Sequence, residues 1–292
     1  DGTNIDSSLV CNGVGLVGCA FVSALTVSAA LVGGFLSGGP YCHAISRMIE
    51  MVKYRRFFSL GFMAMLFAPL VQASTIVATV NAGPAWYNAG QTQTINLQPE
   101  FPNTYDASNV THALASGEFV LSLQRALTAS SLAQMGLALS MDSAARVQGD
   151  VWELADPVFN NFNYQYKVTH KQLAVKGKLL STAFSETILP YVSASVGVGF
   201  NKSYHFTMSP KIYAAIPIPG FQANTETSFA YTLGIGVQRS INQHWQAGVG
   251  YEFADWGKSQ LGPAPGQMMS TSGLKLQHFY TNQLQLSLSY IV

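Results

Sequence analysis

The feature that most constrains the fold is a strict alternation of apolar and polar residues in short segments. The last ten residues show it most clearly, with apolar residues at every second position: Leu284, Leu286, Leu288, Tyr290 and Val292, set against Gln283, Gln285, Ser287 and Ser289. Successive side chains of a β-strand point to opposite faces. The pattern therefore predicts a strand with one apolar and one polar face.

Similar alternation recurs in seven segments upstream, at residues 76–87, 115–124, 133–142, 173–179, 192–201, 229–238 and 245–253. Eight strands make an even number, as in bacterial single-chain outer-membrane barrels. Strands of about 10 residues can cross a membrane when they are tilted. We therefore predict an all-β fold, an eight-stranded antiparallel up-and-down transmembrane β-barrel over residues 74–292.

The composition favours this barrel over a soluble β-sandwich. A sandwich also alternates, but its outer faces carry many charges, and soluble proteins contain about 25% charged residues. This chain has 10% charged residues, and the non-apolar strand faces are rich in Gly, Ser and Gln. The formal net charge of +1 also argues against a nucleic-acid partner, which would require a basic face.

Residues 51–73 have the three regions of a secretory signal peptide. Basic residues at 53, 55 and 56 precede an apolar core at 57–70, and small residues precede a cleavage site between Ala73 and Ser74. Because a signal peptide belongs at an N-terminus, we interpret residues 1–50 as upstream read-through outside the mature protein. The alternative is a genuine N-terminal segment, whose apolar run at 14–36 would make a poor transmembrane helix.

The connections between the expected strands alternate in length. Short ones at 128–130, 181–187 and 240–242 are expected to be periplasmic turns, and long ones at 90–110, 144–162, 204–228 and 255–272 extracellular loops. The third long connection contains an unusual apolar run with two prolines, KIYAAIPIPGF at 211–221. We expect this run either to fold onto the barrel rim or toward lipid, or to present a binding surface.

Strand parity directs five charged side chains into the lumen: Glu118, Asp142, Lys176, Lys178 and Glu252. A charge inside a narrow barrel must be paired, because leaving it alone costs several kcal/mol. We expect a structural network in which the two glutamates face the two lysines. The alternative is a gate that opens a small pore when the pairs exchange partners.

Several runs resemble the small outer-membrane β-barrel family, the OmpA-like transmembrane and opacity-protein-like group. They are the signal peptide, the strands at 196–199 and 248–251, the run YEFADWG at 251–257 and the final residues 288–292. The resemblance covers essentially all of residues 74–292. It implies a location in outer-membrane lipid, and a final strand, from Leu284 to Val292, that the barrel-assembly machinery reads. The family pattern ends in an aromatic residue, which lies here two positions early, at Tyr290.

The function expected from these observations is structural, or a surface interaction with a host or environmental ligand through the long loops. A narrow gated channel is the alternative, and a lipid A-modifying enzyme is the least supported. Barrel deacylases carry a His-x-Ser-Asn arrangement, but at 278–282 this chain reads HFYTN. Thr281 would lie on the opposite strand face from His278, so the two could not cooperate. We expect no catalytic, cofactor or metal site.

Overall fold

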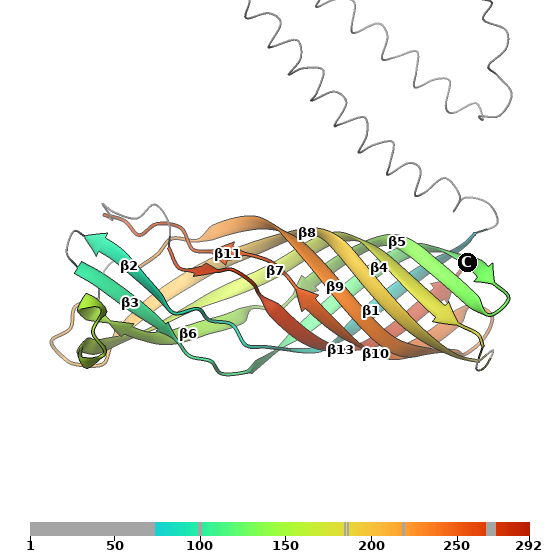
Figure 1. Cartoon of the computed structure of the whole chain (residues 1–292), viewed down its shortest axis with the longest axis horizontal. Coiled ribbons are helices and arrows are strands. Elements are labelled where there is room, and N and C mark those ends of the chain that lie inside the picture. Colours follow the sequence, from blue (N-terminus) through green and yellow to red (C-terminus); the bar gives the residue numbers. More distant parts are fainter. Residues whose placement is uncertain (1–73, 99–100, 184, 186, 218–219, 267–272) are drawn as a thin grey trace, which may run out of the picture. The chain divides into compact units, whose positions relative to one another are not determined.

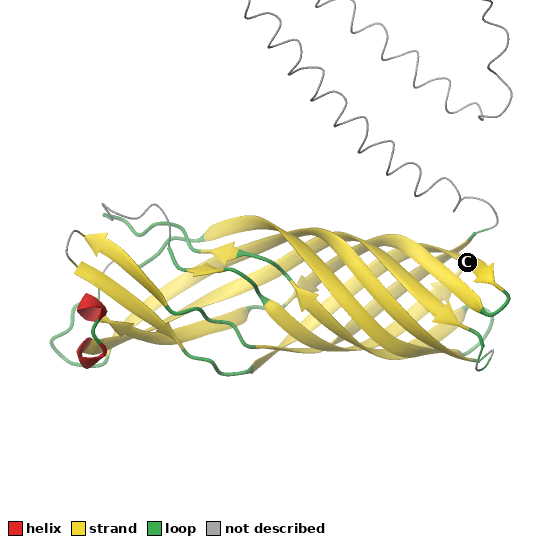
Figure 2. Ribbon diagram, in the orientation of Figure 1, coloured by secondary structure: helices red, strands yellow, loops and turns green. Residues whose placement is uncertain are grey.

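The structure is a computed structural model that describes residues 74–98, 101–183, 185, 187–217, 220–266 and 273–292. The predicted read-through segment 1–50 and the predicted signal peptide 51–73, which includes Ala73 of the cleavage site, lie outside these described residues. Strands dominate the described chain (Figure 2). Of the described helices, none is long and apolar enough to cross a membrane.

Eight antiparallel strands close into a ring, which confirms the predicted barrel. In ring order they are β1 (Thr75–Tyr87), β4 (His112–Thr128), β5 (Ser131–Asp142), β7 (Asn160–Ser181), β8 (Ile188–Pro210), β9 (Asn224–Ser240), β10 (Trp245–Asp255) and β13 (Tyr280–Ile291). β13 pairs with β1, so no edge of the ring is left open. Figure 1 shows the strands running obliquely around the barrel.

The apolar side chains of the alternating segments point outward and the polar ones inward. Each strand of the ring contributes exposed apolar residues, for example Val80, Phe119, Leu137, Leu173, Val196, Ile235, Val249 and Leu286. The interior face carries Ser, Thr, Gln and the buried charges instead. A surface that is apolar outside and polar inside suits lipid as the surrounding solvent.

Aromatic residues mark both borders of this apolar surface. Trp245 packs against Tyr290 at one border, with ring centroids 5.0 Å apart, and Phe253 stacks on Tyr280 at the other, at 5.7 Å. Tyr280 and Tyr290 are ten residues apart on β13, which corresponds to about 33 Å along the strand and about 23 Å along the membrane normal at a tilt near 45°. The result fits the apolar band of about 25 Å in outer-membrane barrels.

The short connections lie at one end of the barrel, between β4 and β5, β7 and β8, and β9 and β10. The long connections lie at the other end, so the short-turn end is periplasmic and the long-connection end extracellular. The long connections are not the plain loops expected from the sequence. Two short strands, β11 (Ser259–Gln260) and β12 (Lys275–Leu276), pair with each other in the β10–β13 connection. Three further strands join the sheet of the barrel: β2 (Gln93–Gln98), β3 (Phe101–Ala107) and β6 (Ala145–Trp152).

These strands extend the barrel wall beyond the membrane. β6 pairs with the first half of β7 and β5 with its second half, while β3 pairs with β6 and β2 with β3. β8 pairs with β7 over nearly the whole length of β7. We call the sheet formed by β2, β3, β6 and the outer halves of β7 and β8 the extracellular sheet; β2, β3 and β6 lie together at one end of the molecule in Figure 1.

Candidate functional site

The centre of the lumen is occupied by one lysine between two glutamates. The Nζ atom of Lys176 donates to Oε1 of Glu118 and to Oε2 of Glu252, at 2.6 Å in both cases. All three side chains are almost fully buried. Parity alone directs them inward, and the stagger of β4, β7 and β10 around the ring brings them together.

Neighbouring polar groups complete the coordination of both carboxylates. Asn81 donates to Oε1 of Glu118 at 2.6 Å, Ser140 to its Oε2 at 3.2 Å, and Gln285 to Oε1 of Glu252 at 3.0 Å. Each of the four carboxylate oxygens therefore accepts at least one hydrogen bond. A buried charge cluster is tolerated when its remaining lone pairs are satisfied in this way.

The other two predicted lumen charges lie apart from this cluster. Lys178 donates to Oε1 of Gln238 at 2.9 Å and its Nζ lies 4.1 Å from the centre of the Tyr191 ring, so it does not pair with a glutamate as expected. Asp142 is buried, and among the described residues neither of its carboxylate oxygens has a hydrogen-bond partner. The structure thus brings three of the five predicted residues into one cluster.

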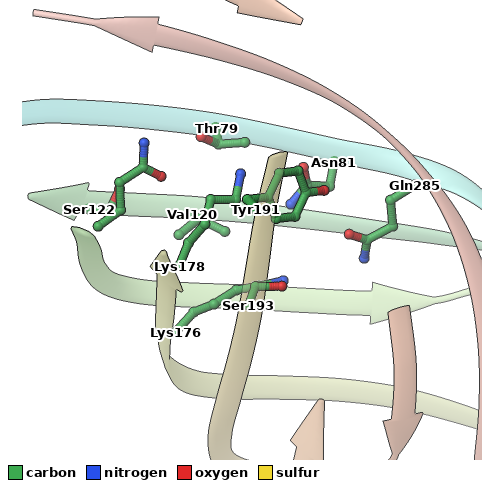
Figure 3. A pocket seen from close by; sticks show the side chains of 10 residues that line it. Thr79, Asn81, Val120, Ser122, Lys176, Lys178, Tyr191, Ser193 and Gln285 are labelled. Carbon is green, nitrogen blue, oxygen red and sulfur yellow. The ribbon is translucent and has the colours of Figure 1, made fainter. Parts of the chain in front are cut away.

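A small cavity lies on the periplasmic side of the cluster. Its volume is about 20 Å³, and Lys176, Lys178, Tyr191 and Gln285 are among its lining residues, as Figure 3 shows. A cavity of this size holds about one water molecule. Below it, Leu180 and Leu189 pack together with Tyr191.

The extracellular end of the lumen is filled by an apolar plug, formed mainly by the β10–β13 connection. Trp256, Leu261, Leu274 and Phe279 are all buried in one cluster with Tyr87 at the end of β1 and with aromatic residues of the extracellular sheet: Tyr105, Phe162, Tyr164 and Tyr166. Nε1 of Trp256 donates to Oγ1 of Thr281 at 2.9 Å. The following Gly257 has φ of 76°, a conformation that favours glycine, and this turns the connection back over the lumen.

The apolar run at 211–221 divides between this core and solvent. Phe221 is buried against Tyr105 and Phe206, whereas Tyr213 is fully exposed and Ile216 nearly so. The backbone N–H of Lys211 donates to the carbonyl oxygen of Asn161 at 2.7 Å, which holds the start of the run against the beginning of β7. Residues 218–219 lie outside the described residues.

Exposed apolar residues lie on the two connections, β6–β7 and β8–β9, at the distal end of the extracellular sheet. We call this set the apolar tip; its members are Val158, Phe159, Ile212, Tyr213 and Ile216. The Nζ atom of Lys211 reaches Oδ1 of Asp150 at 2.8 Å and Oδ1 of Asn160 at 2.8 Å, so polar contacts fix the base of the tip. The sequence suggested part of this surface but not the contribution of the β6–β7 connection.

His278 and Thr281, the nearest match to the His-x-Ser-Asn arrangement of barrel deacylases, both contact other residues. Nδ1 of His278 contacts Oδ2 of Asp255 at 2.8 Å, and its ring stacks on Tyr280. Thr281 is buried and accepts the hydrogen bond from Trp256. His170 is also buried, with Nδ1 2.5 Å from Oδ1 of Asn201. Among the described residues, no group of three or more potential metal ligands occurs.

A shift in the phase of alternation could have revealed the extracellular sheet. On β7 the even positions all face inward; they are apolar from Phe162 to Val168 and polar at His170 and Gln172. The apolar residues move to the odd, outward positions from Leu173 onward. The apolar face must turn toward lipid inside the membrane and toward a protein core outside it. The phase shift therefore locates the membrane surface near residues 169–172.

A closed ring of eight strands with a lipid-facing apolar band and a polar interior defines an outer-membrane β-barrel protein. The outer-membrane location expected from the sequence follows from the same features. The sequence matches no protein-family model and no curated protein.

Solved structures of outer-membrane proteins resemble the chain at low sequence identity. Neisserial surface protein A matches with 10% identity and a TM-score of 0.37, covering 74% of this chain and 96% of that protein. OprG of Pseudomonas aeruginosa matches with 12% identity and a TM-score of 0.40, covering 75% and 97%. The outer-membrane protease OmpT of Escherichia coli matches with 9% identity and a TM-score of 0.37, covering 75% and 97%. Similarity at this level transfers no activity or ligand to this chain.

Proposed function

We propose that the protein is a surface-contact barrel, in which the eight-stranded ring anchors an extracellular sheet whose apolar tip docks on an apolar surface outside the cell. The observation that carries this proposal is the exposure of Tyr213 and Ile216 at the distal end of a sheet with its own buried core. Large apolar side chains exposed on the connections of a membrane-anchored sheet mark an interaction site. A loop without other function would bury them or replace them with polar residues.

The lumen supports an anchoring role for the ring rather than a channel. The triad of Lys176, Glu118 and Glu252 is fully hydrogen-bonded at its carboxylates with the help of neighbouring polar groups, and the plug around Trp256 covers it. Opening a path for ions would require breaking a buried charge cluster, which costs several kcal/mol. Planar-bilayer recordings of the wild type should therefore show no conductance steps, and Glu252→Gln should show none either because the plug around Trp256 remains in place. Stable conductance in the wild type would favour the gated channel instead.

The contact role is tested by the retention of vesicles that carry the full protein on a methyl-terminated surface. The triple variant Val158→Ser, Tyr213→Ser and Ile216→Ser should lose most of the retention. A matched control changes three outward polar residues of the same sheet, Gln148→Ser, Gln165→Ser and Thr207→Ser, and should behave as the wild type. Equal retention of the tip variant and the control would contradict the proposal.

A further inference from the structure

Four basic side chains gather on the outer wall where β6, β7 and β8 meet the membrane. Arg146, Lys167, Lys171 and Lys202 each lie between two buried, inward-facing neighbours, so all four point outward. We call this set the basic cluster. It belongs neither to the lumen nor to the apolar tip.

The strand register places these cations side by side. Arg146 pairs directly with Lys167 across β6 and β7. Lys202 pairs with Thr169 on β7, which places it diagonally between Lys167 and Lys171. Directly opposed residues are separated by about 5 Å between Cβ atoms and diagonal ones by about 7–8 Å. Like charges at these separations repel one another and destabilise the sheet unless an anion lies among them.

Within the described residues, the protein supplies no such anion. None of the four cations has a carboxylate within 4.0 Å among the described ion pairs. The nearby acidic groups are directed elsewhere, since Asp150 binds Lys211 and Asp142 is buried on the inner face. Nζ of Lys202 lies over the aromatic ring of Tyr204, 5.7 Å from its centre.

The position of the basic cluster along the membrane normal indicates which molecule supplies the missing anion. Lys171 pairs with Met141 on one side and Phe200 on the other, and both of these are exposed apolar residues of the lipid-facing band. Lys167 and Arg146 lie on the opposite, extracellular side of the phase shift on β7. The cluster therefore spans the border between acyl chains and headgroups, where lipid phosphates lie.

We propose that Arg146, Lys167, Lys171 and Lys202 form a binding site for the phosphate groups of a phosphorylated lipid in the outer leaflet. The arginine fork can hold a phosphate by two hydrogen bonds, and each lysine contributes a compact charge. Met141 and Phe200 lie beside Lys171, and Leu173 is the next outward residue toward the apolar band, so these three side chains would contact the acyl chains of the same lipid. The site goes beyond the contact role of the apolar tip and does not depend on it.

The test uses the full protein in phosphatidylcholine nanodiscs that contain a minor fraction of diphosphoryl lipid A, with EDTA present to remove bridging cations. Native mass spectrometry counts the lipid A molecules retained by the protein. The double variant Lys171→Gln and Lys202→Gln should retain lipid A with an affinity reduced by about fivefold for each lysine removed. The control Lys258→Gln and Lys275→Gln removes two exposed cations of the β10–β13 connection and should retain it as the wild type does.

Two results would overturn the proposal. One is equal retention by the cluster variant and the control, with both shown to be folded by their heat-modifiable migration in gels. The other is competition by a soluble anion: if free pyrophosphate or heparin displaces lipid A from the wild type at submillimolar concentration, the cluster serves a soluble polyanion. The lipid site is supported if the wild type retains lipid A in the presence of pyrophosphate and of heparin, and if the cluster variant retains less lipid A than the wild type.

Discussion

Lys176 stands between two buried carboxylates, and its single ammonium group neutralises them jointly. Parity along one strand is enough to predict that Glu118, Lys176 and Glu252 point inward, because the side-chain period of a strand is two. Which lysine meets the glutamates depends on the stagger between strands, and an alternating sequence does not encode that stagger. Lys178 lies one inward position away on β7 and binds Gln238 instead.

The triad can be tested by replacing its cation. Lys176→Met should lower the free energy of unfolding by about 3–5 kcal/mol, because it leaves two buried carboxylates without a counter-charge. Lys178→Met is the matched control and should cost clearly less, since a neutral amide loses its partner there. Urea unfolding in lipid vesicles, followed by tryptophan fluorescence, measures both. Equal losses in the two variants would contradict the central role of Lys176.

At the base of the apolar tip, the ion pair of Asp150 and Lys211 should respond to pH. Burial raises the pKa of Asp150, but hydrogen bonds from Lys211 and Asn160 and the charge of Lys211 outweigh it and lower the pKa. The stabilisation is present above the ordinary carboxyl pKa of about 4 and is lost as pH falls below it. Both side chains are partly exposed, so it amounts to no more than about 1 kcal/mol.

Carbon-13 NMR titration of the Asp150 carboxyl in micelles follows this group directly. The wild-type midpoint should lie below that of an ordinary aspartate. In Lys211→Met it should move upward, because one donor and the charge are gone while burial remains. A midpoint unchanged by the substitution would show that Lys211 does not set the ionisation of Asp150.

At the scale of elements, β7 and β8 each serve two environments. Their inner halves line the lumen and face lipid, and their outer halves carry the extracellular sheet. The eight crossing strands could be predicted because lipid demands an apolar outer face on all of them. β2 and β3 could not, because they span only 6 and 7 residues, too few for a clear alternation, and Pro102 interrupts β3. β6 does alternate, with Ala145, Val147 and Val151 buried, but the expected loop obscured it.

The plug can be tested through Trp256, which fills the space above the lumen and contacts the His170 ring at 3.8 Å between centroids. Trp256→Ala should lower the free energy of unfolding by about 3–5 kcal/mol because it leaves a large cavity. Tyr213→Ala removes an aromatic ring that is fully exposed, and it should leave stability nearly unchanged. Thermal unfolding by circular dichroism compares the two. A small loss for Trp256→Ala would mean that the plug packs loosely.

At the scale of the whole molecule, the four tryptophans report how the barrel sits in its bilayer. Trp86 and Trp245 point outward and are exposed at opposite borders of the apolar band. Trp256 is buried in the plug, and Trp152 lies in the extracellular sheet, at the end of β6. Their positions span the membrane and the space beyond it, so one spectroscopic experiment can test the arrangement.

Single-tryptophan variants, with the other three changed to Phe, provide that experiment in vesicles of brominated lipid. The fluorescence of Trp86 and Trp245 should be quenched, because bromine on the acyl chains reaches side chains that face lipid. Trp152 and Trp256 should keep their intensity. Strong quenching of Trp152 would place the extracellular sheet within the bilayer and contradict the assigned membrane border.

The continuous β7–β8 ladder has a mechanical consequence. The pairing runs from Leu180, at the periplasmic end, to Phe162, beneath the apolar tip, with a single irregularity between Gln165 and Lys167. A partner pulling on the tip along the strands would load this ladder in shear, so many bonds would share the force rather than opening one at a time. Tension applied outside the cell would be carried by the backbone into the embedded ring, and the barrel would act as a stiff tether.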